Sequence, residues 1–160
     1  MEASGVIFDI KNDTDVQLLR TAIQGKRIGL TSGSFDLFHH LHLVYLLRCR
    51  RLCEILIVGV DSNDLVCKRK GPERPLVPEH QRVAIVSALA CVHAAFIMGS
   101  VEDFDAAVTQ LGVSVIFKNQ AFAGQKILGA DKAEVVLIHD VTQHTSTSQL
   151  IEEIRKVRSQ

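Results

Sequence analysis

The sequence contains no tryptophan, one tyrosine and seven phenylalanines in 160 residues. So few large aromatic side chains exclude an aromatic-rich binding face and the stacking platforms with which proteins hold single-stranded nucleic acid. Lysine plus arginine and aspartate plus glutamate number 18 each, so the formal net charge is zero. The chain therefore has no net positive charge to attract nucleic acid or an anionic membrane, and any anion-binding site must be local.

Long apolar runs are also absent. Residues 1–12 show no basic start followed by an apolar run, and no uncharged stretch reaches the roughly 20 apolar residues of a membrane span. We therefore expect no secretory signal, no membrane partner and a cytoplasmic location. The four cysteines form no paired CxxC units, so we expect reduced thiols at Cys49, Cys53, Cys67 and Cys91.

What the chain does contain is an ordinary globular composition, with 47% hydrophobic and 22% charged residues. The length suits one domain with a sizeable core. No Pro/Gly/Ser-rich linker, internal repeat or low-complexity tract interrupts it. We therefore expect a single domain over residues 1–160.

Short apolar runs alternate with amphipathic segments along the chain. The apolar runs predict strands at residues 27–31, 54–60, 94–98, 113–117 and 135–138. The amphipathic segments predict one helix after a cap at Asp13 or Thr14, and further helices at 39–51, 79–89, 104–111 and 146–157. This alternation predicts the α/β class, as a Rossmann-like α/β/α sandwich with a five-stranded, mostly parallel sheet.

Ligands of such open sheets bind beyond the carboxyl ends of the strands. The segments that follow the predicted strands there are residues 32–42, 61–81, 118–125 and 139–148. The conspicuous polar residues fall in these four segments, so we expect the functional site to form among them.

The first of these segments carries three histidines within four positions, at the predicted start of a helix. Free backbone N–H groups and the positive end of the helix dipole make such a start an anion site, and imidazoles donate hydrogen bonds to phosphate oxygens. A zinc site built from His39, His40, His42, Cys49 and Cys53 is the alternative. That spacing fits no standard zinc pattern, and Cys49 and Cys53 share one helical face as apolar packing residues would.

The run GSFDLFHHLH at residues 33–42 resembles the GxFDxxHxGH signature of the cytidylyltransferase-like nucleotidyltransferases. The resemblance continues in KGPERP at residues 70–75 and in STS at residues 146–148, and covers about residues 14–156. Within the family, KGPERP is most similar to the adenylyltransferase domain that makes ADP-heptose from heptose 1-phosphate. Glycerol-3-phosphate cytidylyltransferase is a more distant likeness.

The resemblance implies transfer of a nucleoside monophosphate, AMP more than CMP, to a phosphorylated sugar or polyol, with release of pyrophosphate. It implies Mg²⁺ held mostly by phosphates and water, and a homodimer, while the neutral composition predicts no nucleic acid partner. The implied catalytic residues are His39, His42 and Lys70. The implied nucleotide-binding residues are Gly33, Ser34, Phe35, Asp36, Arg82, Lys118, Ser146, Thr147 and Ser148.

Two departures from the family pattern support other functions. Leu41 replaces the glycine between the histidines, where an isobutyl group reaches toward the ribose or base, and Ala121 replaces the acid of a KGGDY segment that here reads KNQAF. A nucleotide-binding or regulatory protein with impaired catalysis is therefore one alternative. A cytidylyltransferase for another phosphate or phosphonate is the other.

Several candidate residues also have plain structural interpretations. Lys68, Arg69 and Lys70 fit a solvated or phosphate-binding loop, and Arg82 could pair with Glu79 or Asp64 instead of binding phosphate. Lys118 could point into the cleft or into solvent. The segment 146–148 also suits a helix N-cap, and a capping turn is itself a phosphate site.

Overall fold

The computed structural model describes residues 5–139, 149, 151, 152, 154 and 156. One sheet of six parallel strands runs in the order β1-β4-β3-β2-β5-β6. The strands are β1 Val6–Ile7, β2 Ile28–Gly33, β3 Ile55–Asp61, β4 Ala94–Met98, β5 Val115–Asn119 and β6 Glu134–Ile138. The α/β Rossmann-like class is confirmed. The expected five strands become six because β1, two residues long on the edge beside β4, is too short to show an apolar pattern.

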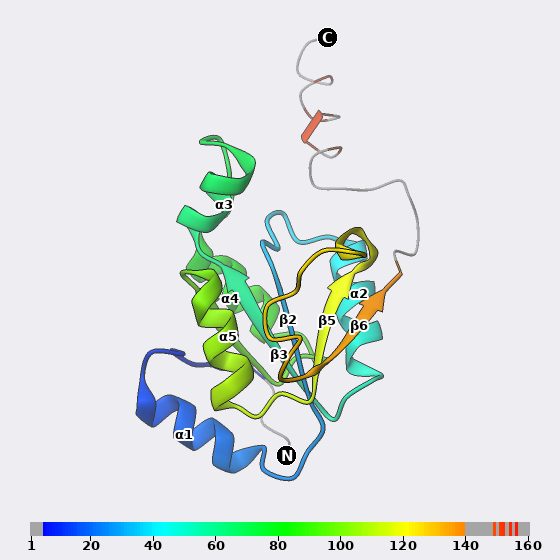
Figure 1. Ribbon diagram of the computed structural model, residues 1–160. Coiled ribbons are helices and arrows are strands. Elements are labelled where there is room, and N and C mark those ends of the chain that lie inside the picture. Colours follow the sequence, from blue (N-terminus) through cyan, green and yellow to red (C-terminus); the bar gives the residue numbers. More distant parts are fainter. Residues whose placement is uncertain (1–4, 140–148, 150, 153, 155, 157–160) are drawn as a thin grey trace.

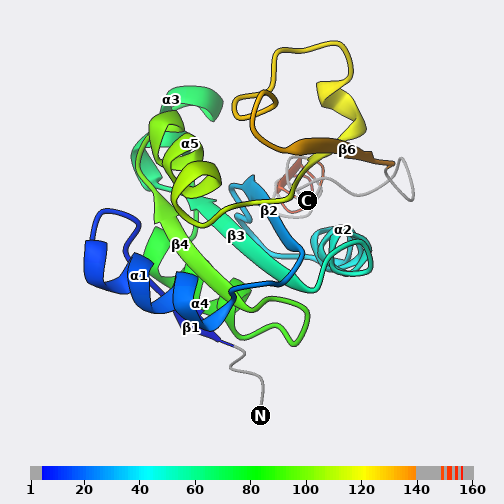
Figure 2. The ribbon, with the colours of Figure 1, turned by 60° about the horizontal axis from the view of Figure 1, so that its bottom comes forward.

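Helices cover both faces of the sheet. On one face α1 (Asp13–Ala22) and α5 (Val101–Gln110) bury Val16, Phe104 and Val108 against the strands. On the other face α2 (His40–Arg50) and α4 (Glu79–Ser87) bury Leu46 and Val86. Figure 2 shows α5 and α2 on opposite sides of β2 and β3. The central strands are therefore apolar on both faces, as their sequences require.

Capping side chains set where two helices begin. The Oδ1 of Asn12 accepts hydrogen bonds from the N–H groups of Thr14 and Asp15, so α1 starts at Asp13 and neither expected residue is the cap. Ser100 and Asp103 form a capping box at the start of α5, which begins three residues before the expected Phe104. Both shifts follow from side-chain caps that lie outside the apolar periodicity.

Helix α3 (Asn63–Lys70) forms where the sequence suggested a turn and a loop. Ser62 caps it, because its Oγ accepts a hydrogen bond from the N–H of Leu65. Asp64 lies in the first turn and three basic residues lie in the last, which suits the helix dipole. The basic run is therefore not a loop, and its side chains start from a fixed backbone.

Figure 1 shows how the elements place the ligand-binding edge. The arrowheads of β5 and β6 point to the same end of the molecule, and α3 stands beyond that end while α1 lies at the opposite one. Residues 149, 151, 152, 154 and 156 are helical, inside the expected closing helix. None of the helices in the described part of the chain is long and apolar enough to cross a membrane.

Candidate functional site

A pocket of about 390 Å³ opens at the carboxyl ends of β2 and β5. Its lining residues come from the end of β2 and the segment after it, from the first turns of α2, from the end of α3, and from the end of β5 and the segment after it. They are Ser32, Gly33, Ser34, Phe35, Leu41, His42, Tyr45, Arg69, Lys70, Lys118, Asn119 and Phe122. Three of the four segments expected from the sequence thus meet at one hollow. The fourth, at 139–148, lies outside the described residues except for its first residue.

The two motif histidines complete the start of α2. The Nδ1 of His39 accepts a hydrogen bond from the N–H of Leu41, and the Nδ1 of His42 accepts one from the N–H of His39, each at 3.3 Å. Their rings stack with centroids 4.0 Å apart. Because each Nδ1 is an acceptor, a neutral ring carries its proton on Nε2. The Nε2 of His39 is buried and has no hydrogen-bond partner among the described residues. His39 therefore has one N–H donor that the described residues leave unused, although His42 and not His39 is among the lining residues of the pocket.

Burial keeps His42 neutral at physiological pH. Desolvation lowers the pKa of His42 to about 4, and the positive charges of His39 and Lys70 add to this effect. Burial likewise lowers the pKa of His39. The ring centroids of Phe35 and Phe38 lie 5.5 and 5.4 Å from that of His42 and contribute to its burial. A neutral imidazole with a fixed Nε2–H acts as a hydrogen-bond donor without titrating near pH 7.

Asp36 anchors the loop that precedes the histidines. Its carboxylate is fully buried, pairs with the Nε of Arg74 at 2.7 Å, and accepts hydrogen bonds from the N–H groups of Leu76 and Val77. Although burial alone raises the pKa of Asp36, these hydrogen bonds hold it below the usual value. Phe35 and Leu37 adopt left-handed backbone with φ of 47° and 50°. The anchored carboxylate of Asp36 thus holds this strained loop in a single backbone conformation.

Two lysines reach the pocket, one held by Ser32 in the last residues of β2 and the other by Ser34 just after that strand. The Nζ of Lys70 lies 2.9 Å from the Oγ of Ser34. The Nζ of Lys118 lies 3.0 Å from the Oγ of Ser32, and 4.3 Å from the ring centroid of Phe104. Burial lowers the pKa of both ammonium groups. Lys118 therefore points into the cleft, which settles the alternative left open by the sequence.

Arg82 does not line the pocket. Only 1% of it is exposed, and its guanidinium donates to the carbonyl oxygens of Ser34, Asp61 and Val77. A further hydrogen bond reaches the Oδ1 of Asn63 at 3.0 Å. None of the ion pairs among the described residues involves Arg82, so the expected partners Glu79 and Asp64 do not hold it. Its geometry is that of a residue that positions the loops after β2 and β3.

The residues that depart from the family pattern take different places. Leu41 lines the pocket beside His42. Ala121 is exposed and outside the lining, whereas Phe122 contributes to it. The Oδ1 of Asn119 accepts a hydrogen bond from the N–H of Ala121 and so starts the short helix η1 (Gln120–Phe122). The side chain of Leu41 thus lies in the pocket as expected, whereas Ala121 lies next to the pocket and not in it.

The remaining expected residues fall into three groups. His40 is exposed on α2. Cys49 and Cys53 are buried free thiols, and burial raises their pKa values to about 12 and about 11. Among the described residues no group of three or more His, Cys, Asp or Glu side chains is placed to hold a metal ion. Ser146, Thr147 and Ser148 lie outside the described residues.

Sequence reasoning did not assign several lining residues to the site, namely Ser32, Tyr45, Asn119 and Phe122, and it considered Arg69 only as part of a basic run. Tyr45 lies four positions after Leu41, one turn along α2, and its hydroxyl contacts the Oγ1 of Thr31 at 2.8 Å. Arg69 pairs with the buried carboxylate of Asp61. Helical spacing from Leu41 would have found Tyr45. Arg69 needed the helix α3, which the sequence did not predict.

Residues 30–159 match the family described as cytidylyltransferase-like. The chain belongs to this family. Among curated proteins it is 29% identical over 148 residues to the bifunctional protein HldE of Nitratiruptor, an alignment covering 91% of this chain and 32% of that one. It is 32% identical over 144 residues to HldE of Helicobacter pylori, which covers 89% of this chain and 31% of the relative. The chain thus spans about a third of the length of these relatives, and the family match indicates a nucleotidyltransferase domain.

Solved structures share the fold of this cytidylyltransferase-like chain. A lipopolysaccharide core biosynthesis protein from Thermoplasma volcanium superposes with a TM-score of 0.61 at 23% identity, covering 74% of this chain and all of that one. Pantothenate synthetase from Thermus thermophilus superposes with a TM-score of 0.62 at 16% identity, over 94% of this chain and 70% of that one. At these identities the likeness extends to the fold alone.

Proposed function

We propose that this domain transfers a nucleoside monophosphate from its triphosphate to a phosphorylated small-molecule acceptor and releases pyrophosphate. The observation that carries the proposal is the histidine pair at the start of α2, with the buried Nε2 of His39 left without a partner and Lys70 in the same pocket as His42. An unused N–H donor at a helix N-terminus, near the ammonium group of Lys70, suits a polyphosphate.

In this reaction an oxygen of the acceptor phosphate attacks the α-phosphorus. A new P–O bond forms to the acceptor as the bond to the β-phosphate breaks, and both electrons of the broken bond leave with pyrophosphate. Such transfer depends on positioning and charge stabilisation and needs no covalent nucleophile from the protein. The Nε2–H groups of His39 and His42, with the Nζ of Lys70, would stabilise the charge that develops on the leaving group.

We propose Mg²⁺ as the partner of the triphosphate. No group of three metal-ligating side chains occurs in the part of the chain that the structure describes, so the described residues do not form a cage of their own. The ion would be held by phosphate oxygens and water, and its chemistry would be to neutralise phosphate charge. Titrating Mg²⁺ during the assay below tests this requirement.

We further propose ATP in preference to CTP, and a sugar or polyol phosphate such as heptose 1-phosphate as the first acceptor to test. The likeness to relatives named HldE supports both choices. The homodimer and the cytoplasmic location stay predictions; light scattering and cell fractionation would test them.

The bulk of Leu41 favours a second candidate, a nucleotide-binding protein with impaired catalysis, because this side chain lines the pocket next to His42. A cytidylyltransferase for another phosphate or a phosphonate is the variant of the first function to test alongside it.

The deciding experiment combines each nucleoside triphosphate with a panel of sugar, polyol and phosphonate acceptors and assays pyrophosphate. Release that requires both substrates supports the transferase. Nucleotide binding without release favours the impaired binder. No release and no nucleotide-induced thermal shift would remove both.

A further inference from the structure

Two serine–lysine pairs flank Gly33 in the pocket. Ser34 holds the ammonium group of Lys70 on one side, and Ser32 holds that of Lys118 on the other. The pocket thus contains two lysine ammonium groups, each held by a different serine, and Arg69 adds a third cation to its lining.

The two lysines approach β2 from opposite sides. In the sheet β2 lies between β3 and β5. Lys70 ends α3, the helix that follows β3, whereas Lys118 belongs to β5 itself. The motif histidines add to the Lys70 side, because His42 lies close enough to Lys70 for that ammonium group to lower its pKa. The Lys118 side has no histidine among its described hydrogen-bond or ring contacts.

An attacking oxygen and a leaving oxygen lie roughly in line on opposite sides of the phosphorus in phosphoryl-type transfer. If pyrophosphate leaves toward the histidines and Lys70, the attacking phosphate must enter from the other side. We propose that Lys118, with Ser32, forms a second anion subsite that binds the phosphate group of the acceptor. This proposal rests on the proposed function, and it assigns Lys118 to the acceptor and not to the nucleotide.

The surroundings of Lys118 suit this role. Its ammonium group lies 4.3 Å from the ring centroid of Phe104, which is buried, and 5.4 Å from that of Phe122, which is partly exposed. One N–H of the ammonium group faces Ser32, which leaves two for a ligand. The acidic group that faces Lys118 is Asp61, whose carboxylate is already held by Arg69. Lys118 is thus fixed in position with donors available.

The test measures binding, so that it needs no turnover. Isothermal titration calorimetry follows inorganic phosphate, with and without a non-hydrolysable α,β-methylene triphosphate, and then the analogue alone. The variants are Lys118→Met, which keeps the stem that packs against the rings, Lys118→Arg, which restores a cation, and Lys70→Met. Lys126→Met is the matched control, because Lys126 is an exposed lysine of the same segment outside the pocket lining.

We expect Lys118→Met to weaken phosphate binding at least tenfold and to change analogue affinity less than twofold, with partial rescue by Lys118→Arg. Lys70→Met should do the reverse, and Lys126→Met should change neither. The inference is overturned if wild type binds no phosphate, or if Lys118→Met weakens the analogue as much as phosphate. Circular dichroism of each variant confirms folding. Failure of the proposed function appears separately, as no pyrophosphate release by wild type in the substrate panel.

Discussion

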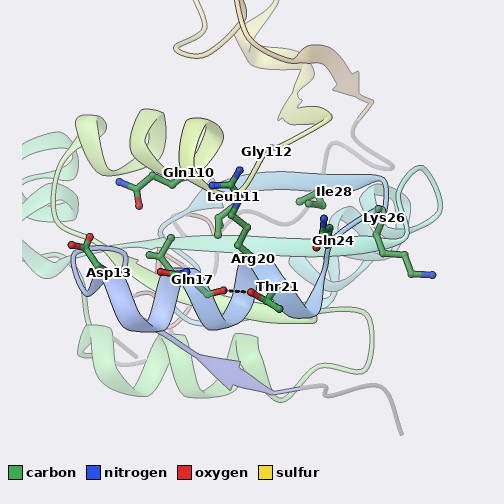
Figure 3. A pocket seen from close by; sticks show the side chains of 12 residues that line it. Asp13, Gln17, Arg20, Thr21, Gln24, Lys26, Ile28, Gln110, Leu111 and Gly112 are labelled. Atoms are coloured by element: carbon green, nitrogen blue, oxygen red, sulfur yellow. Dashed lines mark hydrogen bonds between the residues drawn. The ribbon is translucent and has the colours of Figure 1, made fainter.

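Two hollows lie at opposite ends of the same pair of strands, β2 and β5. The site pocket, at the carboxyl ends, has about 390 Å³. A groove of about 740 Å³ lies at the amino ends, between α1 and the end of α5, and Figure 3 shows its side chains. The larger hollow has the less organised lining. Arg20 and Gln24 are exposed, and the dashed bond in Figure 3 only joins Thr21 to the carbonyl of Gln17 in its own helix.

This difference indicates that hydrogen-bond donors held in fixed positions, and not the volume of a hollow, identify the functional site. In the site pocket each lysine has a serine partner, His42 has a defined tautomer, and Asp36 anchors the loop behind them. Such preorganisation lets a site stabilise charge without reorganising. The groove has polar side chains without this restraint, and five measurements test the difference between the two ends.

The largest effect should come from Asp36→Ala. Removing one partner of the buried Asp36–Arg74 pair leaves Arg74 uncompensated, and about 3–5 kcal/mol of unfolding free energy should be lost. Chemical denaturation measures this. Asp13→Ala, at the groove and in the exposed first turn of α1, should cost less than about 1 kcal/mol. Equal losses would mean that the site loop is not specially anchored.

Next in size is the effect of His39 on turnover. His39→Ala should lower the rate of pyrophosphate release about 10²-fold or more, because it removes the Nε2–H donor. His39→Asn keeps a side chain that caps helices well but lacks that donor. We expect His39→Asn to be as impaired as His39→Ala. Near wild-type activity of His39→Asn would show that His39 acts only as a helix cap.

Acid should weaken the folded state through His42. The unfolded chain takes up this proton near pH 6.5, whereas the folded chain takes it up only near a pKa of about 4. The stability contribution is therefore complete above about pH 6.5 and is lost as the pH falls toward 4. Thermal melting of wild type across this range should show a steeper decline than melting of His42→Gln. Parallel curves for the two proteins would contradict the burial of this ring.

A smaller effect is expected at Leu41. If its side chain crowds the nucleotide, Leu41→Gly should tighten nucleotide binding about fivefold, which corresponds to roughly 1 kcal/mol. Leu41→Ala serves as the control, because it shortens the side chain without the backbone freedom of glycine. Calorimetry with the triphosphate analogue measures both. Unchanged dissociation constants would show that the leucine points away from the ligand.

The smallest effect belongs to the groove. The side chain of Arg20 is exposed and lies outside the lining of the site pocket, so Arg20→Ala should leave pyrophosphate release within a factor of two. A loss comparable to that of His39→Ala would place functional chemistry at the amino ends of the strands and would break the comparison.

The sequence predicted the sheet because β3 and β4 are apolar on both faces and hold that pattern over several residues. It did not predict α3, because residues 63–70 lack an apolar stripe and depend on the Ser62 cap and on charge placement. The pocket was found through the histidines and Lys70. The packing role of Arg82 could not be predicted, because its hydrogen-bond acceptors are carbonyl oxygens, which sequence letters do not show.

That same arginine has a consequence for how this protein can change. The guanidinium of Arg82 donates hydrogen bonds to the backbone carbonyls of Ser34, Asp61 and Val77, so one side chain holds three segments together. An insertion or a change of backbone conformation in any one of these segments would disturb the hydrogen bonds that position the other two. Evolutionary variation of substrate preference should therefore collect in side chains along the rim, such as those at positions 41 and 122, while the course of these segments stays constant.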